Sequence, residues 1–140
     1  MKKQILILAM ALIGTVFTSC EKDEATAEPP SREEILTEGE WSLDYIETKA
    51  FLNDSLMHTE TETIGATVRF YKANYVVAKV PGQPVDTSIY VLAGDNFWLD
   101  DIQNEILVLD NSSFIFTFSE TEQYPEGEVR MQYITNLSRK

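Results

Sequence analysis

The chain has very few of the residues that build catalytic and metal centres. Its 140 residues include one cysteine and one histidine. A Ser-His-Asp triad would have to use His58, which lies in a polar stretch with no nucleophile motif beside it. Zinc sites need several histidine or cysteine ligands, and the six glycines form no phosphate-binding loop. We therefore expect a protein that is not an enzyme and that holds no metal and no cofactor.

Basic residues are also scarce. Eleven lysines and arginines stand against 23 acidic residues, which gives a net charge of −12. A chain this acidic repels nucleic acid and anionic lipid headgroups, so we exclude nucleic-acid binding. Asp100, Asp101 and Glu105 could bind calcium, but no Asp-x-Asp-x-Asn-Gly loop contains them, and we interpret them as a charged hairpin tip. No pair of carboxylates stands out for glycoside hydrolysis.

The first 20 residues have the order of an export signal. Lys2 and Lys3 precede an uncharged run, Ile5–Phe17. As a helix this run would be about 20 Å long, which is short for a bilayer core of roughly 30 Å and typical of a signal peptide. Phe17-Thr18-Ser19-Cys20 resembles the lipobox of bacterial lipoproteins, although leucine is commoner at its first position. The resemblance implies that Cys20 is acylated and becomes the first residue. The alternative is a plain secretory signal.

A polar tether follows the candidate lipidation site. Residues 21–30 contain no large apolar side chain, so we expect residues 20–34 to form a flexible segment between a signal peptide at 1–19 and a domain at 35–140. Removal of residues 1–19, which carry two lysines and no acid, would take the net charge from −12 to −14. Glu21-Lys22-Asp23-Glu24 looks like the surface-export signal of lipoproteins of the Bacteroidota. That implies an outer-membrane lipoprotein on the cell surface, with a solvated linker and a periplasm-facing anchor as the alternative.

Apolar residues alternate with a period of two from Trp41 onward, which predicts β-strands. Ser31 and Glu34 form a capping-box pattern before them, which predicts one short helical turn. Turn residues separate eight candidate strands, and the short connections favour antiparallel neighbours. We therefore predict an all-β domain that closes as a small eight-stranded up-and-down barrel, with an open β-sandwich as the alternative. The expected strand cores are 41–45, 66–71, 75–79, 89–93, 97–99, 107–109, 114–118 and 129–133.

The start of the domain resembles a known family. Leu36 followed by Gly39-Glu40-Trp41-Ser42-Leu43 looks like the Leu…Gly-x-Trp-x-Leu opening of lipocalin-like domains in lipoproteins of the Bacteroidota. The likeness extends over roughly residues 35–137. It implies a barrel whose closed end is plugged by Trp41 and whose interior can hold a small apolar ligand.

The predicted interior supplies the candidate ligand contacts. An eight-stranded barrel is just wide enough to be filled by side chains or to hold one small ligand, so a packed core remains the alternative to a binding site. The candidate ligand-binding residues are Tyr45, Phe70, Tyr75, Val91, Phe116, Met131 and Tyr133.

The long gap Lys49–Thr63 is expected to be a loop across one end of the barrel. Exposed Phe51, Leu52, Leu56 and Met57 on this loop would fit an interface with a protein partner. The second functional hypothesis is therefore an accessory lipoprotein that uses the barrel as a scaffold. Within the same stretch, Asp54-Ser55-Leu56 matches the Asp-Ser/Thr-apolar pattern of O-glycosylation in the Bacteroidota, which makes Ser55 a candidate modified residue.

Overall fold

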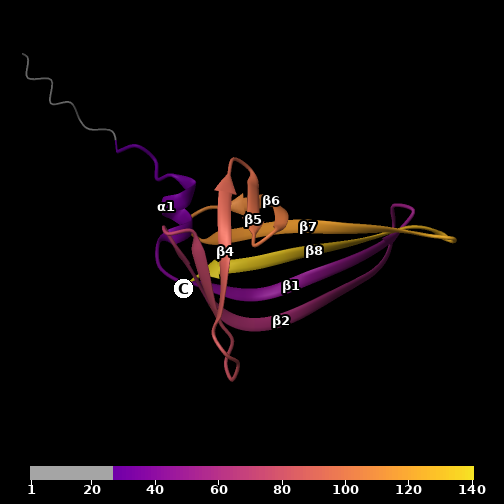
Figure 1. Cartoon of the computed structure of the whole chain (residues 1–140), viewed down its shortest axis with the longest axis horizontal. Coiled ribbons are helices and arrows are strands. Elements are labelled where there is room, and N and C mark those ends of the chain that lie inside the picture. The colour runs from indigo at the N-terminus through magenta and orange to yellow at the C-terminus, as the bar shows by residue number, and fades with distance from the viewer. Residues whose placement is uncertain (1–26) are drawn as a thin grey trace, which may run out of the picture.

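The computed structural model describes residues 27–140 (Figure 1). The predicted signal peptide, Cys20 and the first part of the tether lie outside the described residues. One short helix precedes eight strands. They are α1 (Arg32–Thr37), β1 (Trp41–Leu52), β2 (Ser55–Tyr71), β3 (Tyr75–Lys79), β4 (Asp86–Ala93), β5 (Asn96–Leu99), β6 (Ile102–Leu109), β7 (Ser113–Tyr124) and β8 (Gly127–Arg139).

The eight strands form a closed barrel in chain order. Each strand pairs antiparallel with the next, and β1 pairs with β8 to complete the ring. Short turns make this order possible, and Asn74, Gly94 and Asp100 have the positive φ angles that tight hairpins require. The predicted up-and-down barrel is confirmed, and the open sandwich is excluded because β1 and β8 are paired over the length of both strands.

Helix α1 covers one end of the barrel. The Ser31 hydroxyl accepts a hydrogen bond from the Glu34 N–H at 3.2 Å, and the Ser31 N–H donates to the Glu34 carboxylate at 2.7 Å. This reciprocal pair is the predicted capping box, and its bonds lower the pKa of Glu34. Arg32 fixes the helix to the β4–β5 turn through an ion pair with Asp95 at 2.8 Å. Leu36, on the same helix, is fully buried as part of the hydrophobic core.

Trp41 lies directly beneath the helix and is also fully buried. Its indole N–H donates to the Leu36 carbonyl at 2.9 Å, and the Arg139 guanidinium lies 3.8 Å from the centre of its ring. Arg139 also donates to the carbonyl of Ile35 at 2.6 Å, and burial lowers the pKa of the guanidinium. These contacts close the barrel at the α1 end, which agrees with the role of plug expected for Trp41.

An aromatic cluster fills the barrel below Trp41. Phe97 and Phe114 are fully buried with ring centres 5.3 Å apart, and Phe70 lies 5.8 Å from Phe114. The Tyr90 hydroxyl donates to the Tyr71 carbonyl at 2.9 Å, so its buried oxygen has a partner. Burial raises the pKa of Tyr90, and the nearby Glu33 adds to the rise. This half of the barrel is therefore a packed core.

Four strands continue beyond the barrel as a projecting sheet, which we call the arm (Figure 1). The arm consists of residues 46–52, 55–63, 118–124 and 127–134, in the order β2-β1-β8-β7. It extends past the barrel because β3 pairs with β2 only from Thr67, and β6 pairs with β7 only up to Thr117. The arm is thus a single layer of sheet with two accessible faces.

The arm corrects the expectation of a loop at Lys49–Thr63. This stretch is a β-hairpin in which β1 continues to Leu52 and β2 begins at Ser55. Asn53 and Asp54 form the two-residue connection, with φ angles of 47° and 63°. Two successive residues with positive φ give a turn whose twist matches that of the strands, and asparagine and aspartate tolerate this conformation well. The chain therefore reverses direction within two residues, and the exposed Ser55 lies directly after the turn.

The tips of the two arm hairpins are joined through Asn53. Its backbone N–H donates to the Glu128 carbonyl at 2.9 Å, and its side-chain oxygen accepts from the Glu128 N–H at 3.0 Å. Gly127 makes this approach possible, because its φ is +138° and a Cβ there would collide with the Asn53 side chain.

Gly127→Ala is therefore expected to open the far end of the arm. Backbone amides near residues 53 and 128 should lose protection from hydrogen exchange, while amides of the barrel core should keep theirs, because the collision is confined to the tip. Hydrogen exchange measured by mass spectrometry checks this. Unchanged protection at the tip, or a uniform loss over the barrel, would contradict the account.

Candidate functional site

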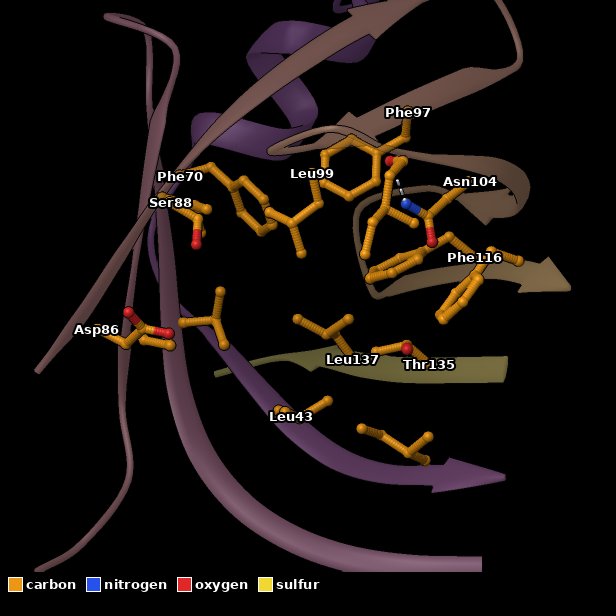
Figure 2. A pocket seen from close by; sticks show the side chains of 16 residues that line it. Leu43, Phe70, Asp86, Ser88, Phe97, Leu99, Asn104, Phe116, Thr135 and Leu137 are labelled. Atoms are coloured by element: carbon orange, nitrogen blue, oxygen red, sulfur yellow. Dashed lines mark hydrogen bonds between the residues drawn. The ribbon is translucent and has the colours of Figure 1, made fainter. Parts of the chain in front are cut away.

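A cavity of about 250 Å³ lies in the barrel below the aromatic cluster (Figure 2). It is partly open to solvent, and most of its wall is apolar. Neither α1 nor Trp41 contributes to the wall, so the cavity lies away from the plugged end. Sixteen residues line it: Leu43, Ile46, Val68, Phe70, Val76, Ala78, Asp86, Ser88, Phe97, Leu99, Ile102, Asn104, Phe116, Phe118, Thr135 and Leu137.

A few polar groups interrupt the apolar wall. Asp86 and Ser88 of β4 lie on one side of the cavity, and Asn104 and Thr135 lie on the other (Figure 2). The Asn104 amide is buried, and its nitrogen donates to the Ile102 carbonyl at 3.0 Å. An apolar cavity with a small number of oriented polar groups is the usual form of a site for a small molecule. Its volume is slightly below the roughly 300–1,000 Å³ of pockets for drug-sized ligands, so the fitting ligand is small.

Two of the predicted ligand-binding residues line the cavity. Phe70 and Phe116 are buried, and both face the open space. Met131 and Tyr133 do not line it. They lie farther along β8, in the arm, on the face that continues the barrel interior.

The expectation that Tyr45, Tyr75 and Val91 face the interior is wrong. Their side chains are 39%, 37% and 46% exposed, and none lines the cavity. For Tyr45 the physical reason is a bulge in β1 between Leu43 and Tyr45, which shifts the alternation so that Ile46 faces inward.

The other two residues, Tyr75 and Val91, lie on the outer faces of their strands. In β3 the buried residue is Val76, and in β4 it is Tyr90. Tyr75 instead stacks on Tyr71, with ring centres 4.5 Å apart. Both faces of these strands carry apolar side chains, so the period of two does not reveal which face is inside.

The polar lining residues Asp86, Ser88 and Asn104 were not among the predicted site residues. The expected strands began at 89 and 107, whereas β4 and β6 begin at Asp86 and Ile102. Extending the alternation backward from Tyr90 would have placed Asp86 and Ser88 on the inner face. The alternation therefore indicates these two positions, but polar residues at a strand end fit the preceding turn equally well.

The other charged or ionisable residues considered as candidate sites lie in turns or on the surface. Asp100 sits in the β5–β6 turn with a φ of 51°, and its carboxylate accepts the Ile89 N–H at 2.9 Å. The expected hairpin tip is confirmed for Asp100 and Asp101, but it is wrong for Glu105, which lies within β6 and pairs with Asn96. His58 is exposed on β2. Within residues 27–140 no three histidine, cysteine or acidic side chains come together in a metal-binding arrangement. None of the helices in that range is long and apolar enough to cross a membrane.

Comparison with known proteins adds no identification. No protein-family model matches the chain, and no curated protein has significant sequence similarity to it. The functional argument therefore depends on the barrel, its cavity and the arm.

Proposed function

We propose that the protein is a lipid-anchored, lipocalin-like barrel that binds a small amphipathic molecule in its cavity. The observation that carries this proposal is the partly open cavity in the barrel, on the side away from helix α1. Its apolar wall fits a hydrocarbon or ring system, and Asp86, Ser88, Asn104 and Thr135 offer partners for one or two polar groups. The protein would act by binding and not by catalysis.

The ligand proposal is tested on the full chain carrying Cys20→Ser, so that no attached lipid competes for the cavity. Titration with the apolar fluorophore N-phenyl-1-naphthylamine should give saturable binding with one site per barrel. Native mass spectrometry of the same protein should show a single-ligand adduct that solvent extraction removes. A linear, unsaturable titration together with the absence of any adduct would refute a cavity ligand.

The anchor is proposed on the lipobox resemblance. In this proposal Cys20 carries the lipid, the residues between Cys20 and helix α1 connect it to the barrel, and the acidic residues after Cys20 direct the protein to the cell surface. The alternative is a periplasm-facing position. An anchored barrel would capture its ligand next to the outer membrane.

Cys20→Ser is expected to abolish incorporation of radiolabelled palmitate, because Cys20 would be the residue that carries the lipid. Protease treatment of intact cells then distinguishes surface display from a periplasmic position. Continued palmitate labelling of the serine variant would contradict lipidation at Cys20.

A second candidate function is protein interaction through the arm. The hairpin Lys49–Thr63, for which a partner was expected from sequence, forms half of the arm, and Leu56 and Met57 on it are 55% and 64% exposed. A single-layer sheet with two accessible faces has no evident role in closing the barrel, which favours a docking role.

A further inference from the structure

The two faces of the arm can be assigned from strand register. Alternation along β1 and β8 places Thr48, Ala50, Tyr133 and Met131 on the face that continues the barrel interior, which we call the inner face. Side-chain contacts agree with this assignment. Phe118 stacks on Tyr133 on the inner face with ring centres 4.7 Å apart.

The outer face holds the basic residues of the arm. The Arg130 guanidinium lies 4.0 Å from the centre of the Phe51 ring and 3.7 Å from the Asp54 carboxylate. Lys49 forms an ion pair with Glu47 at 2.9 Å. These two are the only lysine or arginine residues in the arm, and both have acidic neighbours on their own face.

An apolar stripe runs along the middle of the inner face. It occupies the two central strands, β1 and β8, together with Phe118 on the adjacent β7. The stripe reaches the cavity, because Phe118 also lines the cavity. Its side chains are only partly buried, since no second layer covers the arm. The stripe consists of Ala50, Leu52, Phe118, Val129, Met131 and Tyr133.

Acidic side chains border this stripe on both sides. Glu60 and Glu62 project from β2, and Glu120 and Glu122 project from β7, all four exposed. We call these four residues the rails. The inner face therefore has an apolar centre and no lysine or arginine. Glu60 and Glu62 lie toward the barrel on the β2 border, and Glu120 and Glu122 lie toward the tip on the β7 border. His58, which pairs with Ala50, also lies on the β2 border of this face.

We propose that the inner face of the arm binds a cationic amphipathic helix of a partner protein. The rails lie on strands three spacings apart, or about 14 Å, and a helix with its side chains is about 10–12 Å wide. The seven residues of β1 in the arm span roughly 20 Å, which is the length of about 14 helical residues. A helix of that size would place its apolar stripe on β1 and β8 and its lysines or arginines against both rails.

The charge pattern distinguishes this occupant from others. A second copy of the chain would bring to this face the same four glutamates and no lysine or arginine, so like charges oppose face-to-face docking. A surface of anionic lipid would be repelled by the same four carboxylates. A helix that is apolar in the middle and basic on both flanks complements each part of the face.

The test uses a synthetic helix of about 14 residues made of leucine and lysine, with leucines spaced three and four apart, labelled for fluorescence anisotropy. It is titrated with the full chain carrying Cys20→Ser. Binding at one site is expected. A variant with Glu60, Glu62, Glu120 and Glu122 replaced by glutamine should bind roughly tenfold more weakly or worse, because it loses all four charge partners.

The matched control carries Glu28→Gln, Glu33→Gln, Glu38→Gln and Asp101→Asn, which remove the same charge from exposed positions outside the arm. Its affinity should stay within twofold of the parent, and Met131→Gln should weaken binding through loss of apolar contact. Equal weakening in the two charge variants would show unspecific attraction to an acidic protein and overturn the proposal. So would self-association of the unliganded chain that Met131→Gln abolishes, because the face would then belong to a second copy.

The result is independent of the cavity ligand. Binding of the naphthylamine fluorophore should be unchanged in the rail variant, since none of the four glutamates lines the cavity. Loss of peptide binding with retained fluorophore binding separates the two functions.

Discussion

Replacing Trp41 by alanine is expected to lower the free energy of unfolding by about 3–5 kcal/mol. The ring is fully buried between helix α1 and the aromatic cluster, and its centre lies 6.1 Å from that of Phe114. The substitution removes this packing and leaves a cavity at the end of the barrel that helix α1 covers. It also removes the indole N–H that donates to the Leu36 carbonyl and the ring beneath the Arg139 guanidinium, so the carbonyl loses its side-chain partner and the guanidinium loses its cation–π contact.

Urea denaturation followed by far-ultraviolet circular dichroism measures this effect. The matched control is Trp98→Ala, because Trp98 is the other tryptophan and is only partly buried on β5. That variant should lose about 1 kcal/mol or less. If Trp41→Ala does not fold, Trp41→Phe keeps most of the ring and should lose about 1–2 kcal/mol through the missing N–H. Equal losses at the two tryptophans would contradict the role of Trp41 as the plug.

The barrel could be predicted because its signals are local. Each of the eight strands contains its own short run of apolar residues, and each connection contains residues that favour a tight turn. The capping box of α1 is equally local, since Ser31 and Glu34 contact each other within one turn. Antiparallel neighbours with short connections leave few ways to arrange eight strands, and closure between β1 and β8 satisfies both edges of the barrel.

The site could be predicted only in part, because it depends on which face of each strand is inside. Phe70 and Phe116 were predicted to face inward and do line the cavity, because large apolar residues occupy the next positions of the same face. These residues are Val68 before Phe70, and Phe114 and Phe118 on either side of Phe116. Tyr75 and Val91 lie on strands with apolar residues on both faces, where the choice depends on the tertiary packing. The bulge near Tyr45 is a non-local feature, because it is defined by the register of β1 against β8.

The sequence pattern does not predict the arm, for a different reason. Its strands are rich in threonine and glutamate, such as the run Thr59–Thr63, and such polar stretches do not show the alternation that marks a half-buried strand. The pairing of β1 with β8 out to Leu52 and Val129 holds the segment in register. The exposed glutamates at both borders also disfavour edge-to-edge pairing between copies of the chain, a common hazard of unpaired strands.

Ala78→Trp is expected to abolish binding of N-phenyl-1-naphthylamine. Ala78 lines the cavity from β3, pairing with Asp86 of β4 and Val68 of β2, which are also lining residues. An indole at this position would occupy much of a cavity of about 250 Å³ and would stand between the ligand and the polar group at Asp86. Because a site of this size has little spare volume, we expect affinity to fall by at least tenfold.

Ala93→Trp provides the matched control for this prediction. Ala93 is exposed on β4 and does not line the cavity, so the same change in side-chain volume should leave binding within twofold of the parent. Circular dichroism and urea denaturation of both variants test whether the barrel is retained. Should Ala78→Trp destabilise the fold, Leu99→Phe adds less volume to the same wall and should weaken binding by a smaller factor. Fluorophore binding that is unaffected by Ala78→Trp in a folded barrel would place the ligand elsewhere, and the cavity would then be a packing defect of the barrel.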